Sequence, residues 1–142
     1  MQTTTADARP ATAAAAHPRT GAGWMPVTGR VLTALAGAFL LFDGGARLAG
    51  FAPYVEGTVQ AGYAESLAPA IGITLLAATV LYLLPRTAVL GAILLTGYLG
   101  GAVATHLRLG QPVFFPAVFG VVVWAARYLR DPRLRDSLPV RR

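Results

Sequence analysis

The feature that most constrains the fold is the stretch TAVLGAILLTGYLGGAVATHLR, residues Thr87–Arg108. It is apolar on every face of a helix and has no charged side chain before its final polar residues, His106 and Arg108. A core helix of a soluble protein needs only one apolar face, whereas a helix that crosses a bilayer needs about 20 apolar residues in succession. The stretch therefore predicts a membrane-spanning helix.

The composition supports a membrane protein. Of the 142 residues, 55% are hydrophobic and only 13% are charged, whereas a soluble domain has about 25% charged residues. The net charge of +6 comes from arginine alone, and the arginines lie in short stretches between apolar runs. We therefore expect contact with a lipid bilayer and no nucleic-acid partner. The chain has no cysteine, which excludes thiolate metal sites and thiol relays within it.

Further apolar stretches predict an all-α membrane protein, a bundle of four transmembrane helices. Pro85-Arg86 is so short a connection that it makes the second and third spans an antiparallel hairpin. Between the first two spans, Pro53–Ala61 predicts a short interfacial helix that ends at Gly62. The expected spans are about 27–49, 67–84, 87–108 and 113–128. They lie in a membrane domain of residues 27–130. A disordered tail, 1–26, precedes this domain, and an arginine-rich cytoplasmic tail, 131–142, follows it.

The orientation follows from where the arginines fall, because short cytoplasmic segments carry an excess of positive charge. Only Arg47 and Arg108 lie on one side of the predicted spans. The other side carries Arg19, Arg30, Arg86, Arg127, Arg130, Arg133, Arg135, Arg141 and Arg142. An even number of spans places both ends of the chain on one side. We therefore expect a multi-pass protein of the cytoplasmic (inner) membrane with both termini in the cytoplasm.

Four polar residues at the outer ends of two spans form the candidate site. Asp43 and Arg47 stand four residues apart at the end of the first span, and His106 and Arg108 end the third. If these spans are neighbours, the four groups line a polar pocket, in which arginine and histidine donate hydrogen bonds and aspartate orients them. Such a pocket suits a quinone or another polar head group. The alternatives are that Asp43 and Arg47 only pair with each other, and that His106 and Arg108 only mark the membrane boundary. We expect no metal site, because one histidine and one aspartate are too few.

Small residues predict where helices approach closely. Gly37 lies on a face of small residues in the first span, and Gly97-x-x-x-Gly101 with Gly100 lies in the third. Glycines at this spacing let two helix backbones come together. We expect them to pack helices within the bundle, with a homo-oligomer as the alternative.

Four segments, taken in order, resemble the bacterial DoxX-like family. The segments are LFDGGAR (41–47), LLPRTAVLGA (83–92), GYLGGAVATHLR (97–108) and YLRDPRLR (128–135), and the likeness extends over about residues 28–136. The resemblance implies a four-helix integral membrane protein. Most such proteins have no assigned activity, and the wider family takes its name from a subunit associated with a thiosulfate:quinone oxidoreductase. Some relatives are linked to membrane complexes that handle oxidative stress, and distant ones assist membrane-protein assembly. The resemblance supplies no set of catalytic residues.

Three functions are consistent with these features. The leading hypothesis is an accessory or quinone-facing subunit of a redox or stress-related membrane assembly, with membrane or redox partner subunits, quinone as its cofactor and no stand-alone enzymatic activity. The second is a non-enzymatic membrane scaffold or assembly factor. The third is a small-solute permease, which four short spans rarely form without oligomerising.

Overall fold

A computed structural model describes residues 23–137, and within that range every regular element is a helix. The elements are α1 (Trp24–Leu48), α2 (Ala52–Gln60), the short 3-10 helix η1 (Glu65–Leu67), α3 (Ala68–Leu83), α4 (Ala88–Arg108), α5 (Phe114–Arg130) and α6 (Pro132–Ser137). The helix expected within the segment between the first two spans is present as α2. α1 begins at Trp24, slightly before the expected start of the first span, and the rest of the predicted disordered tail lies outside the described residues.

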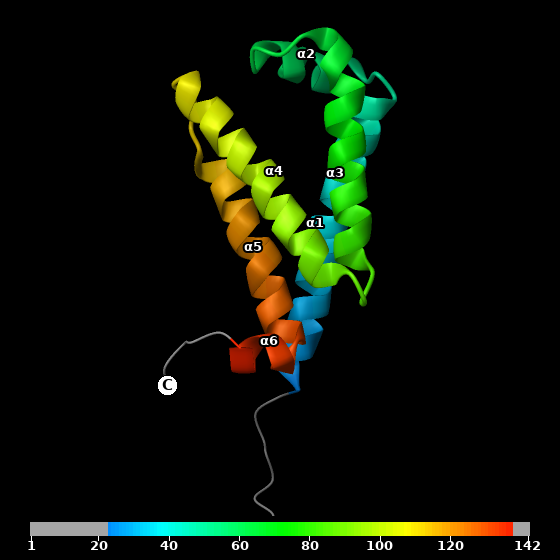
Figure 1. Ribbon diagram of the computed structural model, residues 1–142, viewed down its shortest axis with the longest axis vertical. Helices are drawn as coiled ribbons and strands as arrows, with labels where there is room; N and C mark the ends of the chain where they lie inside the picture. The colour runs from blue at the N-terminus through cyan, green and yellow to red at the C-terminus, as the bar shows by residue number, and fades with distance from the viewer. Residues whose placement is uncertain (1–22, 138–142) are drawn as a thin grey trace, which may run out of the picture.

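The four long helices form a ring in which each contacts two others. α1 packs against α3 and α5, and α4 packs against the same two helices from the opposite side. α1 and α4 therefore face each other across the bundle without backbone contact, so the predicted first and third spans are not neighbours. Figure 1 shows that α4 diverges from α3 and α1 toward the end of the bundle that α2 crosses. Both ends of the described chain lie at the other end.

Three stretches are long and apolar enough to cross a membrane, judged by length and composition: Trp24–Leu48, Glu65–Leu83 and Ala88–Arg108. Many large apolar side chains point away from the bundle, among them Leu35, which is 65% exposed, and Ile93, which is 54% exposed. Continuous apolar surface of this kind is typical of a protein that contacts lipid. The chain is a multi-pass membrane protein.

The apolar core lies between the four long helices. Leu75 and Leu95 are completely buried in it, and the hydroxyl of Tyr82 donates a hydrogen bond to the carbonyl oxygen of Val123 across the bundle at 3.1 Å. At Gly91 the backbone of α4 lies directly against the backbone of Leu81 and Tyr82 in α3. The core cluster comprises Leu40, Leu75, Ala78, Tyr82, Ala92, Leu95 and Val123. The hairpin of α3 and α4 is therefore tightly closed where these helices meet.

The glycines expected to pack helices behave in two ways. A Cβ atom at Gly37 would lie 2.6 Å from Cδ2 of Leu83, so this glycine permits close contact between α1 and α3. A Cβ atom at Gly97, Gly100 or Gly101 would meet nothing within 4 Å. At these three positions α4 therefore faces open space within the described chain. Gly91, which the sequence analysis did not single out, makes the close approach of α4 instead.

Candidate functional site

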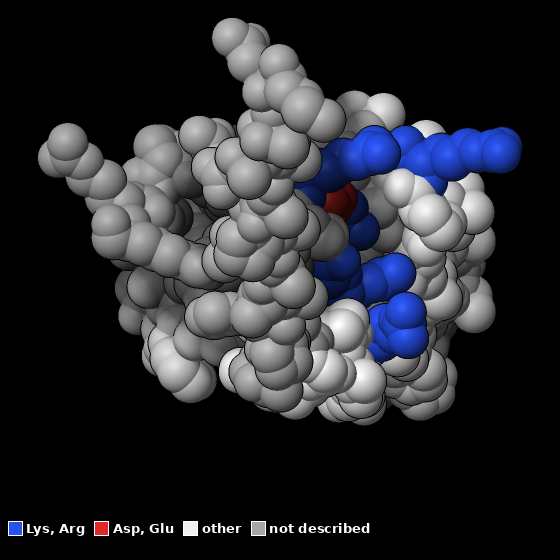
Figure 2. Space-filling model, turned by 90° about the horizontal axis from the view of Figure 1, so that it is seen from below, with Lys and Arg blue, Asp and Glu red and all other residues white. Residues whose placement is uncertain are grey.

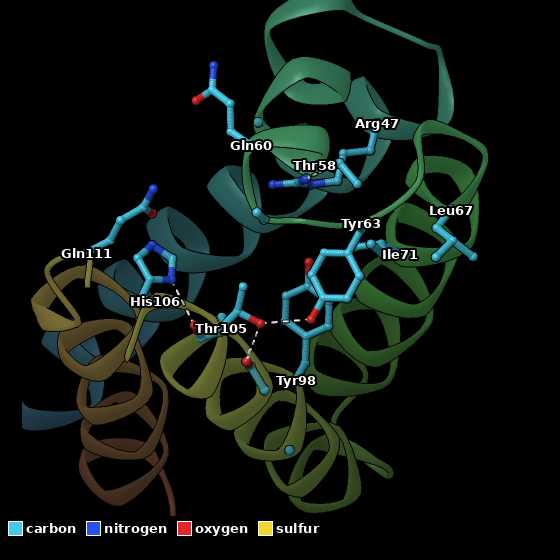
Figure 3. A pocket seen from close by; sticks show the side chains of 15 residues that line it. Arg47, Thr58, Gln60, Tyr63, Leu67, Ile71, Tyr98, Thr105, His106 and Gln111 are labelled. Carbon is cyan, nitrogen blue, oxygen red and sulfur yellow. Dashed lines mark hydrogen bonds between the residues drawn. The ribbon is translucent and has the colours of Figure 1, made fainter. Parts of the chain in front are cut away.

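A cavity of about 610 Å³ lies between α2 and α4, at the end of the bundle where the helices diverge (Figure 3). Small-molecule sites usually have volumes of about 300–1,000 Å³, so this cavity is large enough for one. Residues from α1, α2, the turn after α2, η1, α3, α4 and the turn after α4 form its walls. The polar ones are Arg47, Thr58, Gln60, Tyr63, Tyr98, Thr105, His106 and Gln111, and Leu67 and Ile71 are the larger apolar ones.

One stripe of α4 forms a wall of the cavity. Its residues are spaced as a single helical face requires, in pairs that recur every fourth position. Because Gly97 and Gly101 have no side chains, they leave open space in front of this face. The stripe consists of Gly97, Tyr98, Gly101, Ala102, Thr105 and His106.

His106 has a defined orientation. Its Nδ1 atom lies 2.8 Å from the carbonyl oxygen of Ala102, one turn earlier in α4. A carbonyl oxygen only accepts hydrogen bonds, so Nδ1 carries the proton in the neutral ring. Nε2 makes no hydrogen bond to any residue from 23 to 137 and remains available to the cavity. The neutral ring therefore presents an acceptor to a ligand, and the protonated ring presents a donor.

Arg47 enters the cavity from α1 and is held from two sides. Asp43, one turn earlier, accepts two hydrogen bonds, from Nε at 3.2 Å and from Nη2 at 3.3 Å. The Nη1 atom donates to the hydroxyl of Thr58 at 2.8 Å and to the carbonyl of Tyr54 at 3.4 Å, both in α2. Thr58 is almost completely buried. Arg47 thus fixes α2 across the end of α1, and Asp43 orients Arg47 without itself lining the cavity.

Two hydrogen bonds connect the far end of α2 to α4. The hydroxyl groups of Tyr63 and Thr105 lie 2.8 Å apart, and Nη2 of Arg108 donates to the carbonyl of Ala61 at 2.9 Å. The chain reverses here at Gly62, whose φ of +81° is a conformation that glycine adopts without strain. These contacts keep α2 over the cavity, although α2 and α4 do not pack backbone against backbone.

The four predicted site residues have different positions. Arg47 and His106 line the same cavity, on walls formed by different helices. Asp43 contacts Arg47 from behind, and Arg108 binds the turn after α2 outside the cavity. The structure therefore brings two of the four to the cavity and places the other two around it. α2 joins the two walls, because α1 and α4 are not in contact.

Six polar residues of the cavity were not among the predicted site residues: Thr58, Gln60, Tyr63, Tyr98, Thr105 and Gln111. Tyr98 and Thr105 lie on the same helical face as His106, so periodicity along the third predicted span would have identified them. The position of Tyr63 depends on how the chain folds back after α2, which no local pattern shows. The hydroxyl of Tyr98 makes no hydrogen bond to another described residue and is, like His106, available to a ligand.

In chemical terms, the cavity combines hydrogen-bonding groups with apolar surface. Arg47 and His106 provide hydrogen-bonding groups on different walls, with tyrosine hydroxyls between them, while Leu67 and Ile71 provide apolar contact. Within residues 23–137, no three histidine, aspartate or glutamate side chains come together as metal ligands would.

Comparison with known families gives one match. The model of the DoxX-like family matches residues 31–126, which is more than half of the chain and extends from α1 into α5. Comparison with curated proteins and with solved structures returned no match.

Proposed function

The chain belongs to the DoxX-like family, and from this premise we propose that it is a four-span protein of the cytoplasmic membrane that binds a quinone head group between α2 and α4. In this proposal it acts as an accessory subunit of a redox or stress-related membrane assembly. The observation that carries the proposal is that Arg47 and His106 reach one cavity of about 610 Å³ from different walls.

Two features support four spans. α5 has 17 residues, which at 1.5 Å per residue give a length of about 26 Å, close to the hydrocarbon thickness of a bilayer. It packs along both α1 and α4, and the side chains of Phe114 and Val121 are exposed. If α1, α3 and α4 cross the membrane, a helix of this length beside two of them occupies the same layer.

The described charges support an orientation with both termini in the cytoplasm. Arg47 and Arg108 belong to the α2 end of the bundle, together with the acidic residues Asp43, Glu56 and Glu65. The opposite end carries Arg30, Arg86, Arg127, Arg130 and Arg133 with one acidic side chain, Asp131, among the residues whose side chains are described. An arginine-rich end is the one that stays in the cytoplasm. In that orientation α2 lies at the outer surface of the membrane.

The hydrogen-bonding groups of the cavity match both forms of a quinone ring. Tyr98, Arg47 and protonated His106 would donate hydrogen bonds to the carbonyl oxygens of an oxidised ring. Nε2 of neutral His106 would accept from a hydroxyl group of a reduced ring and could take its proton. The apolar tail of a quinone would leave past Leu67 and Ile71 toward the lipid.

We assign an accessory role because oxidation of a quinol needs an electron acceptor. Oxidation of a bound quinol would need an acceptor for two electrons, and this sequence has no cysteine thiol to receive them. The proposal assigns ring binding and proton exchange to this chain. It assigns electron transfer to a redox partner subunit in the same membrane.

Two glycines on adjacent positions of α4 provide the sharpest test. Gly101→Leu places a side chain inside the cavity, whereas Gly100→Leu places one outside it, and neither new Cβ atom meets a neighbour within 4 Å. Protein purified from membranes is assayed for bound quinone by extraction, and for rebinding of a short-chain quinone by equilibrium dialysis. We expect Gly100→Leu to bind as the wild type does, and Gly101→Leu and His106→Ala to lose most of the bound quinone.

A further variant separates orientation from contact. Asp43→Ala removes the carboxylate behind Arg47 without changing the lining of the cavity, so quinone binding is expected to weaken rather than disappear. Wild-type protein without saturable quinone binding would refute the proposal, as would equal losses in the Gly100→Leu and Gly101→Leu variants. The scaffold or assembly-factor function would then be the better explanation.

A further inference from the structure

The hydroxyl groups of Tyr63 and Thr105 share a hydrogen bond whose direction follows from the neighbouring contacts. Oγ1 of Thr105 lies 3.0 Å from the carbonyl oxygen of Gly101, one turn earlier in α4, and 2.8 Å from the hydroxyl oxygen of Tyr63. Figure 3 shows both bonds meeting at Thr105. A carbonyl oxygen only accepts, so the single hydroxyl proton of Thr105 goes to Gly101, a bond that threonine often makes in helices. Tyr63 is therefore the donor in the other bond.

Tyr63 thus offers a ligand an acceptor and no donor. A phenolic hydroxyl has one proton, and in Tyr63 this proton points to Thr105. Both partners of the bond line the cavity, and Tyr63 is 39% exposed. Neutral His106 is an acceptor as well, because Nδ1 donates to Ala102 and Nε2 keeps its lone pair. The wall formed by α4 and the turn after α2 therefore presents two acceptors to a ligand.

Arg47, on another wall, has nearly all of its donors in use. A guanidinium group has five N–H groups. Asp43 accepts one from Nε and one from Nη2, while Thr58 and the carbonyl of Tyr54 accept the two on Nη1. Thr58 acts as an acceptor there because its own proton goes to the carbonyl of Tyr54 at 2.9 Å. One N–H group of Nη2 is left for a ligand.

The charge of Arg47 is balanced by that of Asp43, whose two carboxylate oxygens hold the guanidinium group. The opposite end of the bundle differs in this respect, because arginine side chains there outnumber the acidic ones (Figure 2). Arg47 and Asp43 together present one donor and no net charge to the cavity. The cavity therefore suits an uncharged ligand that can both accept and donate hydrogen bonds.

We propose that Tyr63 is a specificity residue that makes the cavity prefer a reduced ring, a quinol, over the oxidised quinone. This inference rests on the proposed quinone site and names the redox form that the site selects. A quinol hydroxyl donates a hydrogen bond to Tyr63 or to neutral His106, whereas a quinone carbonyl that faces either group has no proton to donate. Arg47 does not discriminate, because a hydroxyl oxygen and a carbonyl oxygen both accept from it. Tyr98 serves both forms, since its hydroxyl can donate or accept.

The test measures the dissociation constants of one short-chain quinone and of its quinol on purified full-length protein, by equilibrium dialysis without oxygen. Because the chain has no cysteine, a reductant that keeps the quinol reduced finds no disulfide or thiol to alter. Water solvates the two forms differently, so the informative quantity is the ratio of the two constants, compared between variants. Any loosening of α2 weakens both forms alike and cancels in this ratio.

Four variants test the bond between Tyr63 and Thr105. Tyr63→Phe removes the acceptor. Its matched control is Tyr54→Phe, because Tyr54 does not line the cavity and its hydroxyl makes no hydrogen bond to a described residue. Thr105→Val keeps the shape of the side chain but leaves the proton of Tyr63 free to point to a ligand. Thr105→Ser keeps the hydroxyl that both bonds need.

Tyr63→Phe should lower the preference for the quinol about fivefold, which corresponds to the loss of one hydrogen bond between neutral groups. Thr105→Val should lower it at least as far, because Tyr63 can then donate to the quinone. Thr105→Ser and Tyr54→Phe should keep the wild-type ratio. Gel filtration shows whether each variant is folded, and if Tyr63→Phe is not, the two Thr105 variants carry the test.

Two results would overturn this inference alone. One is an unchanged ratio in both Tyr63→Phe and Thr105→Val. The other is an equal change in Thr105→Val and Thr105→Ser, which would show that the direction of the bond has no effect on the ligand. In both cases the protein still binds the two forms, so the proposed function stands. Failure of the wild type to bind either form would refute the proposed function and this inference together.

Discussion

Gly91 offers the clearest quantitative test of how this bundle is packed. A Cβ atom added at Gly91 would overlap backbone atoms of Leu81 and Tyr82 in α3. Backbone atoms have no rotamer that would relieve the overlap, so Gly91→Ala must push α4 away from α3. The side chains that this movement separates include Tyr82 and Leu95, both almost fully buried.

The size of the effect follows from two opposing contributions. Overpacking a well-packed core costs about 1–3 kcal/mol, and an overlap with rigid backbone belongs at the upper end or above it. Alanine in place of glycine stabilises a helix by about 1 kcal/mol. We therefore expect Gly91→Ala to lower the free energy of unfolding by about 2 kcal/mol. Gly100→Ala, whose Cβ meets nothing, should raise it by up to about 1 kcal/mol.

The assay is unfolding by sodium dodecyl sulfate in mixed micelles, followed by tryptophan fluorescence, with both variants measured beside the wild type. We expect a difference of about 3 kcal/mol between the free energies of unfolding of the two alanine variants. If Gly91→Ala left the free energy of unfolding unchanged, that result would contradict the close approach of α3 and α4. If Gly100→Ala were equally destabilising, Gly100 would have to pack against a second copy or a partner helix.

Further predictions concern α2 and the topology. Tyr63→Phe removes the hydrogen bond to Thr105 of α4 and should destabilise α2 by about 1 kcal/mol, which is measured as faster hydrogen exchange in α2. Tyr54→Phe is the control, because the hydroxyl of Tyr54 makes no hydrogen bond to a described residue, and it should leave exchange unchanged. Thr58→Val leaves a guanidinium donor without its acceptor and should lower the free energy of unfolding by about 1–2 kcal/mol, whereas an unchanged value would contradict the anchoring of α2 to α1. Because the chain has no cysteine, the single variants Ser66→Cys and Arg86→Cys can each be labelled with a membrane-impermeant maleimide. In intact cells we expect only Ser66→Cys to be labelled. Labelling of both variants, or of Arg86→Cys alone, would refute the proposed orientation.

The sequence predicted the class of fold because its strongest signals are local. Long apolar runs at Trp24–Leu48 and Ala88–Arg108 indicate membrane helices without reference to any neighbour. Turn residues predicted the hairpin between α3 and α4. Gly62, predicted to end the helix between the first two spans, follows α2 and has a positive φ, as glycine often does after a helix. The four motifs that suggested the DoxX-like family are equally local. The family match confirms the family and, over residues 31–126, includes the first three of these motifs.

The spacing of four residues also predicted that Asp43 and Arg47 can pair on one side of the helix. They form a bidentate ion pair over one helical turn. What the sequence left open was whether this pair meets His106. The interpretation required the first and third spans to be neighbours, and they are not. Arg47 and His106 line one cavity only because α2 folds back over the gap between their helices.

The sequence by itself determined that this protein is helical, enters a membrane, belongs to its family and carries polar groups near the ends of its spans. These properties depend on composition and on periods of a few residues. Only the tertiary structure decided which helices touch, that Gly91 rather than Gly97 or Gly101 makes the close contact, and that the latter two open a cavity. The physical reason is that lipid-facing and helix-facing surfaces are equally apolar, so hydrophobicity does not reveal which faces meet; side-chain shape and the few polar contacts across the bundle decide that.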